Sequence, residues 1–264
     1  MDDAWATIDA LADDTEHGAS EIAERAARAL PEIPGGELAD AIETILRGHP
    51  QMAPLWRLAS DLLSAGGAAS GAELFLRRLS DDGEAVAVLA PILSDEVLTL
   101  SYSSTVVEAI RMRQPKRVLC MTSDPGGEGL TMMGAVAAYT DASVIEDDEA
   151  LKEVPAQAVV IGADAITPAS VINKFKTRTL AEAARGRNVP CFVLAGETKF
   201  VPDDLPGDDA FESTPLDLFS GFASPMGLIT PSEAAAHAAS VQMHPALRML
   251  VERILEEPVE DATR

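Results

Sequence analysis

The residues best suited to chemistry follow the predicted strand of residues 158–163. Asp164 comes directly after this apolar run ("AVVIGA"), and Asn173 and Lys174 follow within ten residues. A carboxylate at the end of a strand can exchange a proton with a ligand, and an Asn-Lys pair can bind a phosphate. We expect Asn173, Lys174 and Lys176 at the start of the next helix. The alternative is that the two lysines are simply solvated there.

A second set of polar residues lies in "LSYSSTV", residues 100–106. Ser101, Ser103, Ser104 and Thr105 follow a predicted strand and open a predicted helix. Their hydroxyls and the free backbone N–H groups of the helix start can hold an anion. The alternative is ordinary capping of the helix by Ser103 or Ser104.

A glycine-rich loop, "TSDPGGEG" at residues 122–129, joins another predicted strand to a helix. Loops of this kind cradle phosphate in many α/β proteins, but this one carries Asp124 and Glu128 and neither Lys nor Arg. Its glycines match neither G-x-G-x-x-G nor the P-loop. Taken alone, the loop is therefore predicted to be a tight turn around Pro125.

The remaining reactive side chains give weaker signals. Glu197 and Lys199 follow a later strand, and we expect a surface ion pair there. Cys120 and Cys191 lie inside apolar runs and are predicted to be buried. The four histidines do not cluster and no metal-ligand spacing is present, so we predict neither a metal site nor a cofactor.

The order of predicted elements indicates how these residues are positioned. Up to about residue 80 the hydrophobic period is helical, with Ser20 as the N-cap of one helix and Gly48 as the C-cap of another. From about residue 94, apolar runs alternate with helical stretches, which is typical of a parallel, Rossmann-like sheet. We therefore predict an α/β protein with a helical domain at 1–93 and a Rossmann-like domain at 94–264. Residues 201–215 are expected to form a long acidic loop.

The composition narrows the class of protein. The net charge is −23, with 43 acidic residues against 20 basic ones, and the acids are spread along the whole chain. This favours a protein adapted to molar salt, of haloarchaeal type, and argues against direct nucleic-acid binding. No apolar run is long enough to span a membrane, and the acidic start of the chain favours a cytoplasmic protein.

These motifs together resemble the alpha/beta/delta family of translation initiation factor 2B. That family also includes methylthioribose-1-phosphate isomerase and archaeal ribose-1,5-bisphosphate isomerase. The resemblance is carried, in chain order, by segments at residues 17–27, 50–58, 99–110, 122–129, 162–166, 171–181 and 196–200. It implies a helical N-terminal domain packed on a Rossmann-like domain, and a homodimer.

The resemblance also assigns site residues. It implies that Asp164 corresponds to the Asp that moves protons in the isomerases, and that Asn173-Lys174 corresponds to the family's Asn-Lys pair. Three positions depart from the isomerase pattern. Ser101 stands where the isomerases have their Cys, Asp124 where an Arg-Pro turn has its Arg, and His17, before Gly18, where another Arg lies. The resulting ligand-binding candidates are His17, Gly18, Ser101, Ser103, Asp124, Asn173 and Lys174.

These departures favour a regulatory, non-catalytic member that binds a small phosphorylated metabolite or nucleotide. A serine hydroxyl is far less acidic than a thiol, whose reference pKa is about 8.5, so Ser101 is a poor proton carrier without an adjacent base. The first alternative is an aldose–ketose isomerase that uses Asp164 with Ser101. The second is a scaffold whose acidic surface docks a partner.

Overall fold

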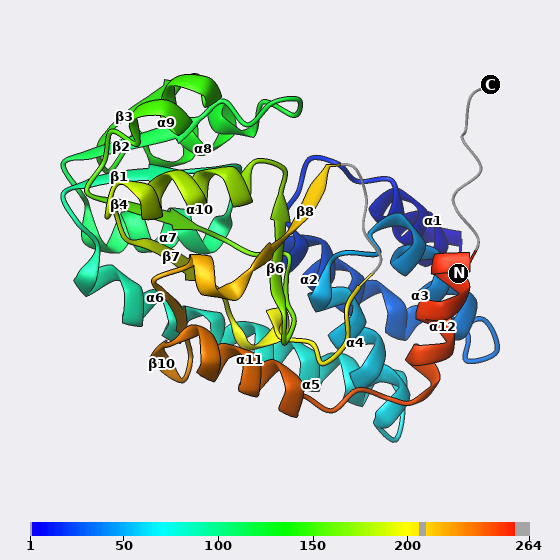
Figure 1. The fold of residues 1–264 in the computed structure, drawn as a ribbon. Helices are drawn as coiled ribbons and strands as arrows, with labels where there is room; N and C mark the ends of the chain where they lie inside the picture. The colour runs from blue at the N-terminus through cyan, green and yellow to red at the C-terminus, as the bar shows by residue number, and fades with distance from the viewer. Residues whose placement is uncertain (1, 206–209, 257–264) are drawn as a thin grey trace.

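The computed structural model describes residues 2–205 and 210–256 (Figure 1). Its N-terminal part is a bundle of helices: α1 (Asp2–Ala12), α2 (Ala19–Ala29), α3 (Leu38–Gly48), α4 (Ala53–Ser64) and α5 (Ala68–Ser80). Their apolar faces enclose one core, which includes the fully buried Trp56 and Phe75. The C-terminal helix α12 (Ala246–Glu256) returns to this bundle and adds Leu247 and Leu250 to the same core.

The ends of two predicted helices can be checked directly. α3 ends with Gly48 as its last helical residue, so that His49 and not the predicted Gly48 is at the C-cap position. α2 begins two residues earlier than predicted, with Gly18 instead of Ser20 at its N-cap position. The reason is the preceding turn, in which Asp14 accepts the backbone N–H groups of Glu16 and His17 and brings the chain into the helix at Gly18.

The second part is built on a seven-stranded sheet with the order β10-β9-β7-β4-β1-β2-β3. The strands are β1 (Glu96–Thr99), β2 (Arg117–Met121), β3 (Asp141–Ile145), β4 (Ala158–Ile161), β7 (Cys191–Leu194), β9 (Gly221–Ser224) and β10 (Gly227–Ile229). All neighbouring pairs are parallel except β10 with β9, which form an antiparallel hairpin at one edge. The predicted α/β class, with helices followed by a mostly parallel sheet, is confirmed.

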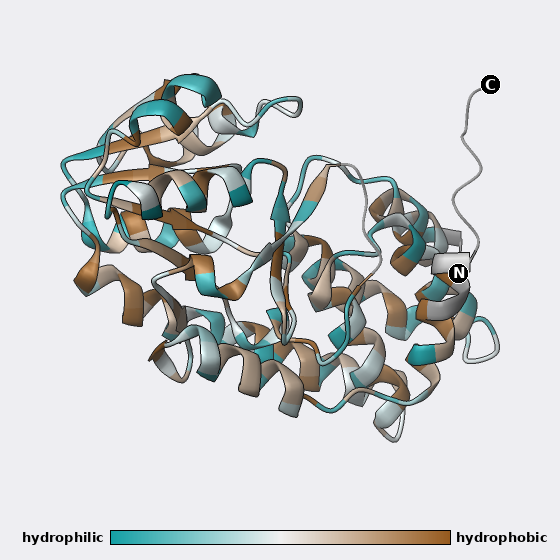
Figure 2. Cartoon of the chain, in the orientation of Figure 1, coloured by the Kyte–Doolittle hydropathy of each residue, from teal (hydrophilic) through white to brown (hydrophobic). Residues whose placement is uncertain are grey.

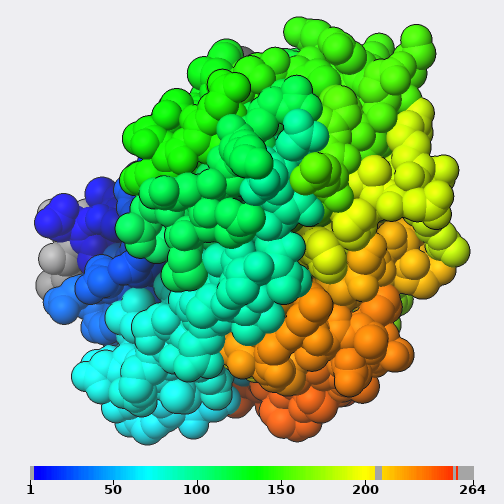
Figure 3. All heavy atoms as spheres, turned by 90° about the vertical axis from the view of Figure 1, so that its left-hand side faces the viewer, coloured from blue at the N-terminus to red at the C-terminus, as the bar shows by residue number. Residues whose placement is uncertain are grey.

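Helices cover both faces of this sheet. One face packs against α6 (Asp82–Leu89), α7 (Ser104–Arg113) and α8 (Glu128–Val136), and the other against α9 (Asp147–Glu153), α10 (Thr177–Gly186) and α11 (Pro231–Ser240). Hydrophobic residues accordingly concentrate on the strands and on the inner sides of the helices (Figure 2). Cys120 and Cys191 are buried and free, as predicted. α6 precedes the first strand but packs on the sheet, against β9 and β10, and Figure 3 shows this face with the cyan and orange segments side by side.

A small antiparallel sheet, which the sequence did not reveal, stands between the two parts. Its strands are β5 (Ala165–Ile166), β6 (Ser170–Lys174) and β8 (Phe211–Pro215), in the order β5-β6-β8. Asn173 and Lys174 thus lie on a strand, and the prediction that they begin a helix is wrong. The predicted acidic loop likewise ends in β8. Both errors have one cause: β6 pairs with residues about 40 positions away, such as Thr214 with Val171, and local periodicity does not report such pairing. No helix in the described ranges is long and apolar enough to cross a membrane.

Candidate functional site

Most of the predicted site residues gather where the parallel strands end. The loops after β1 and β2 are tied together there, because the backbone N–H of Ser101 donates to Oγ of Ser123 at 2.8 Å. Ser123 in turn donates to the carbonyl of Met121. Ser101, Ser123 and Lys176 all have positive φ angles, of 62°, 65° and 78°. Such strained backbone clusters at binding sites, so the carboxyl edge of the sheet is the candidate site.

The start of α7 closes over the end of β4. Ser103 is the N-cap residue of α7 and its Oγ accepts the backbone N–H of Val106, which confirms the predicted capping role. A side chain at Gly162 would collide with this serine, since a Cβ there would lie 2.6 Å from Oγ of Ser103. The glycine therefore allows the helix start, with its free N–H groups, to approach the strand end closely.

The glycine-rich loop binds a carboxylate of this chain. Buried Asp147, at the start of α9, accepts the backbone N–H groups of Ser123 and Asp124 at 2.9 and 3.0 Å. It also pairs with Nζ of Lys176 at 2.5 Å. Two backbone N–H groups at the start of the loop are thus already bonded to a carboxylate of the chain. Asp124 itself is exposed, and Gly127, with φ of 72°, ends the turn and caps α8.

Lys174 and Asn173 are both buried beside this loop. Nζ of Lys174 pairs with Oε1 of Glu128 at 2.5 Å, while Oε2 of Glu128 has no hydrogen-bond partner among the described residues. Gly126 lies against the same carboxylate, where a Cβ would come within 2.2 Å of it. Asn173 donates from Nδ2 to Oγ1 of Thr177, so that the pair is fixed at the end of β6.

Asp164 lies just past the end of β4, as predicted, and connects the two parts of the molecule. Its backbone N–H donates to Ile172 on β6, and its carbonyl accepts the N–H of Ala53 at the start of α4. The side chain is half-buried, and its charge opposes the lowering of the Lys199 pKa by burial.

Asp82 and Lys199 are buried titratable residues. Asp82 is not among the predicted site residues, and Lys199 was predicted to lie at the surface. Each is only 7% exposed. Burial raises the pKa of Asp82 to about 7, against the opposing effect of the Lys199 charge. Burial lowers the pKa of Lys199, opposed by Asp164 and Asp82. The only sequence signal for this pair was the position of Lys199 after a strand.

The predicted surface ion pair between Glu197 and Lys199 is therefore wrong. Glu197 instead pairs with Arg57 of α4 at 3.4 Å and with His237 of α11 at 2.8 Å. These partners come from elements far away in the sequence, so the local sequence does not indicate which residues Glu197 pairs with.

His17 and Gly18 lie in the helical part. His17 contacts Asp14 at 2.8 Å and Glu21 at 3.3 Å, both from its own segment, and Gly18 caps α2. No contact recorded for the described residues joins either one to the sheet edge. Their place in a ligand site stays a prediction.

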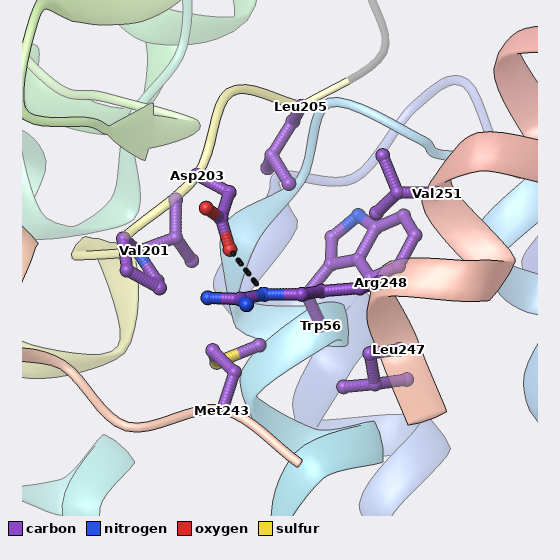
Figure 4. Close-up of a pocket in the computed structure, with 9 residues that line it drawn as sticks. Trp56, Val201, Asp203, Leu205, Met243, Leu247, Arg248 and Val251 are labelled. Carbon is purple, nitrogen blue, oxygen red and sulfur yellow. Dashed lines mark ion pairs between the residues drawn. The ribbon is translucent and has the colours of Figure 1, made fainter. Parts of the chain in front are cut away.

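A separate hollow of about 210 Å³ lies between α4, α12 and the segment that follows residue 200 (Figure 4). Its walls are apolar, with Trp56, Met243 and Leu247 among them, and Arg248 crosses it to pair with Asp203 at 3.6 Å. None of the predicted site residues lines it. In the part of the chain that the structure describes, no group of three His, Cys, Asp or Glu side chains is placed to hold a metal ion.

Comparison with known proteins identifies the family. The sequence profile described as Initiation factor 2 subunit family matches residues 69–225. The chain belongs to this family. It is 29% identical over 257 residues to the translation initiation factor eIF-2B subunit 2-like protein of Pyrococcus horikoshii, covering 81% of this chain and 91% of that protein. The crystal structure of Pyrococcus horikoshii OT3 translation initiation factor eIF-2B matches with a TM-score of 0.78 and 26% identity, over 88% of this chain and 98% of that one.

An isomerase is also among the relatives of this initiation factor 2 family member. Methylthioribose-1-phosphate isomerase of Trichoplax adhaerens is 27% identical over 199 residues, covering 62% of this chain and 55% of that protein. The predicted family is confirmed by these matches. They include both a factor-like protein and an isomerase, so the choice between regulation and catalysis depends on the site.

Proposed function

We propose that this protein is a regulatory, non-catalytic member of the family that binds a small phosphorylated metabolite or nucleotide at the carboxyl edge of its sheet. The observation that carries the proposal is the environment of Ser101. Its backbone N–H bonds to Ser123, and Ser123 is itself engaged with a backbone carbonyl. Among the described residues no hydrogen bond joins the Ser101 hydroxyl to a base, and a serine that transfers a proton needs such a base.

The ligand's phosphate is proposed to bind at Lys174. This lysine is buried, it lies beside Asn173, and its carboxylate partner Glu128 directly follows Gly126 and Gly127. Among the described residues Glu128 is bonded through only one of its oxygens, so an incoming phosphate competes with a half-satisfied carboxylate. The start of α7, with Ser103 and Thr105, offers further donors.

A thermal-shift screen of sugar phosphates and nucleotides in concentrated potassium chloride tests this function. A ligand at about 100 times its Kd is expected to stabilise the fold by about 2.7 kcal/mol. Lys174→Met is expected to abolish the shift. Lys116→Met is the matched control, because Lys116 is an exposed lysine that pairs with Asp95 at 2.8 Å. If no compound shifts the melting temperature of the unaltered protein, the proposal is wrong.

A homodimer is part of the same proposal. It is supported by the family resemblance. Light scattering in the same buffer is expected to give twice the chain mass, and a monomer at micromolar concentration would contradict this expectation.

The second candidate is an aldose–ketose isomerase. It is favoured by the position of Asp164 at a strand end, next to the buried charge of Lys199, and by the isomerase among the relatives. This candidate predicts turnover of pentose or methylthioribose phosphates that Asp164→Asn abolishes. Absence of turnover across such a panel excludes it.

A further inference from the structure

The hollow beside α12 lies on the core of the helical part, away from the sheet edge. Trp56 and Leu247 line it and belong to that core, and they are only 1% and 3% exposed. Met243, which packs against the same core, and buried Val201 form further walls. Small-molecule sites are typically apolar hollows that carry a few polar groups in fixed places. This hollow has that form, because its apolar walls are accompanied by one ion pair.

The volume of the hollow limits what can bind in it. An apolar cavity of about 150 Å³ takes up one benzene molecule. The hollow, at about 210 Å³, therefore has room for one aromatic ring with a short side chain. A helix of another protein does not fit, since with its side chains it is about 10–12 Å across. The occupant is accordingly a small molecule.

The side chains of the walls favour an aromatic ring. Trp56 offers an indole, and aromatic rings pack on one another in offset or edge-to-face arrangements. Nε1 of Trp56 already donates to the carbonyl of Pro50 at 2.8 Å, so the rest of the indole is available as apolar surface. Met243 adds a thioether, whose sulfur makes favourable contacts with ring edges.

Arg248 supplies the charge at this hollow. Its side chain extends from α12 across the hollow toward Asp203 (Figure 4). Nε of Arg248 lies 3.6 Å from Oδ2 of Asp203, and this ion pair is the one polar contact of the guanidinium among the described residues. A hydrogen bond would be about 2.7–3.2 Å long. A guanidinium binds a carboxylate best through two parallel N–H bonds, and its terminal nitrogens remain available for such a pair.

We infer that this hollow binds a small aromatic carboxylic acid, with its ring against Trp56 and Met243 and its carboxylate on the guanidinium of Arg248. The ligand's carboxylate competes with Asp203 for that guanidinium. This site is separate from the one in the proposed function and does not depend on it, because neither Lys174 nor any other predicted site residue lines the hollow.

Calorimetric titration of the full chain with phenylpropionate tests this inference, in concentrated potassium chloride at pH 7. Saturable binding is expected. Propionate, which lacks the ring, is expected not to bind. Phenylpropionamide keeps the ring but has no charge, and it should bind about two- to fivefold more weakly than the acid, as is typical when an exposed ion pair is lost. If phenylpropionate does not bind, or if propionate binds equally well, the inference is wrong.

Met243→Trp locates the ring. The larger side chain fills the hollow and is expected to abolish binding of phenylpropionate. Met249→Trp is the matched control, because Met249 is on the same helix, is 64% exposed and does not line the hollow. Equal affinities of the two variants would place the ligand elsewhere and overturn the inference.

Arg248→Met locates the carboxylate, and it also serves if Met243→Trp fails to fold, since the Arg248 side chain is 75% exposed. It is expected to weaken the acid about two- to fivefold and to leave the amide unchanged. Arg185→Met is the control, because Arg185 is exposed and lies 3.9 Å from an aspartate in the same way. Asp203→Asn removes the competing carboxylate and should strengthen binding of the acid. Equal losses for acid and amide in Arg248→Met would refute the pairing with Arg248.

Discussion

The two sides of the crevice differ in how completely their polar groups are bonded. On the side of β2 and β3, Asp147 accepts two backbone N–H groups and a lysine, and Lys174 pairs with Glu128 at 2.5 Å. On the side of β4 and β7, Asp82 and Thr99 keep buried oxygens without a partner among the described residues. Internal pairing is therefore more complete on the first side, although Oε2 of Glu128 there also lacks a partner among the described residues.

This difference bears on the role of the glycine-rich loop at residues 122–129. The negative charge of Asp124 disfavours phosphate binding in this loop. Asp147 accepts the backbone N–H groups of Ser123 and Asp124, which are the first amides of the loop. The loop is thus held as a structural turn. We call the side of β2 and β3 the bonded side, and the side of β4 and β7 the unbonded side.

The largest expected effect is that of Lys199→Met on the unbonded side. It removes the buried cation that opposes the negative charge of Asp82 and Asp164. Leaving buried charge unpaired costs about 3–5 kcal/mol in the free energy of unfolding, measured by urea denaturation at pH 8. At pH 5 the loss should be smaller, since Asp82 is then protonated. Lys116→Met serves as the exposed control, and equal losses in the two variants would contradict burial of Lys199.

Asp147→Ala tests the bonded side. It deletes the acceptor of two backbone N–H groups and the partner of Lys176. Because hydrogen bonds to a charged group are worth about 1.5–3 kcal/mol and are not additive, we expect a loss of about 2–3 kcal/mol of unfolding free energy. Asp148→Ala, at the exposed next position, should change stability by less than about 0.5 kcal/mol. A small loss for both variants would show that the loop does not depend on Asp147.

The pH dependence of stability should distinguish Asp82 from the partnered carboxylates. Its folded-state pKa of about 7 lies above the ordinary value of 3.8, so the folded protein binds the proton more tightly than the unfolded chain. Stability from this group is therefore full below about pH 4 and falls by up to about 1.4 kcal/mol for each pH unit as the pH rises from there to 7. Comparing urea midpoints of the unaltered protein and Asp82→Asn at pH 4.5, 6 and 7.5 isolates this slope. An identical pH profile for the two proteins would refute the shift.

The smallest effect is expected for Asp124→Arg. It places a cation where the isomerases carry one, on an exposed position of the loop. We expect inorganic phosphate to bind about tenfold more tightly, which corresponds to about 1.4 kcal/mol. Asp141→Arg adds the same charge at the opposite, amino end of β3 and should leave the affinity unchanged. If the two variants behave alike, the loop is no longer part of a phosphate site.

The sequence by itself determined the architecture and the local features of the site. Apolar runs separated by helical stretches were sufficient to predict a parallel sheet covered on both faces, and hydroxyls at a helix start were sufficient to predict the Ser103 cap. The ordered motifs also led to the correct family. Each of these inferences uses residues that are close together in the chain, where period and composition carry the information.

Only the tertiary structure decided which charges are paired and which are buried. Asp147 reaches Lys176, Glu128 reaches Lys174, and α6 brings Asp82 onto the end of β7, each across a long stretch of chain. The strand pairing of β6 with β8 is of the same kind. Burial and partner choice are properties of the assembled fold, because a side chain's environment is set by elements that the local sequence does not specify. The sequence could thus indicate the edge of the sheet as the site, while the packing of α6 against that edge divided it into a bonded and an unbonded side.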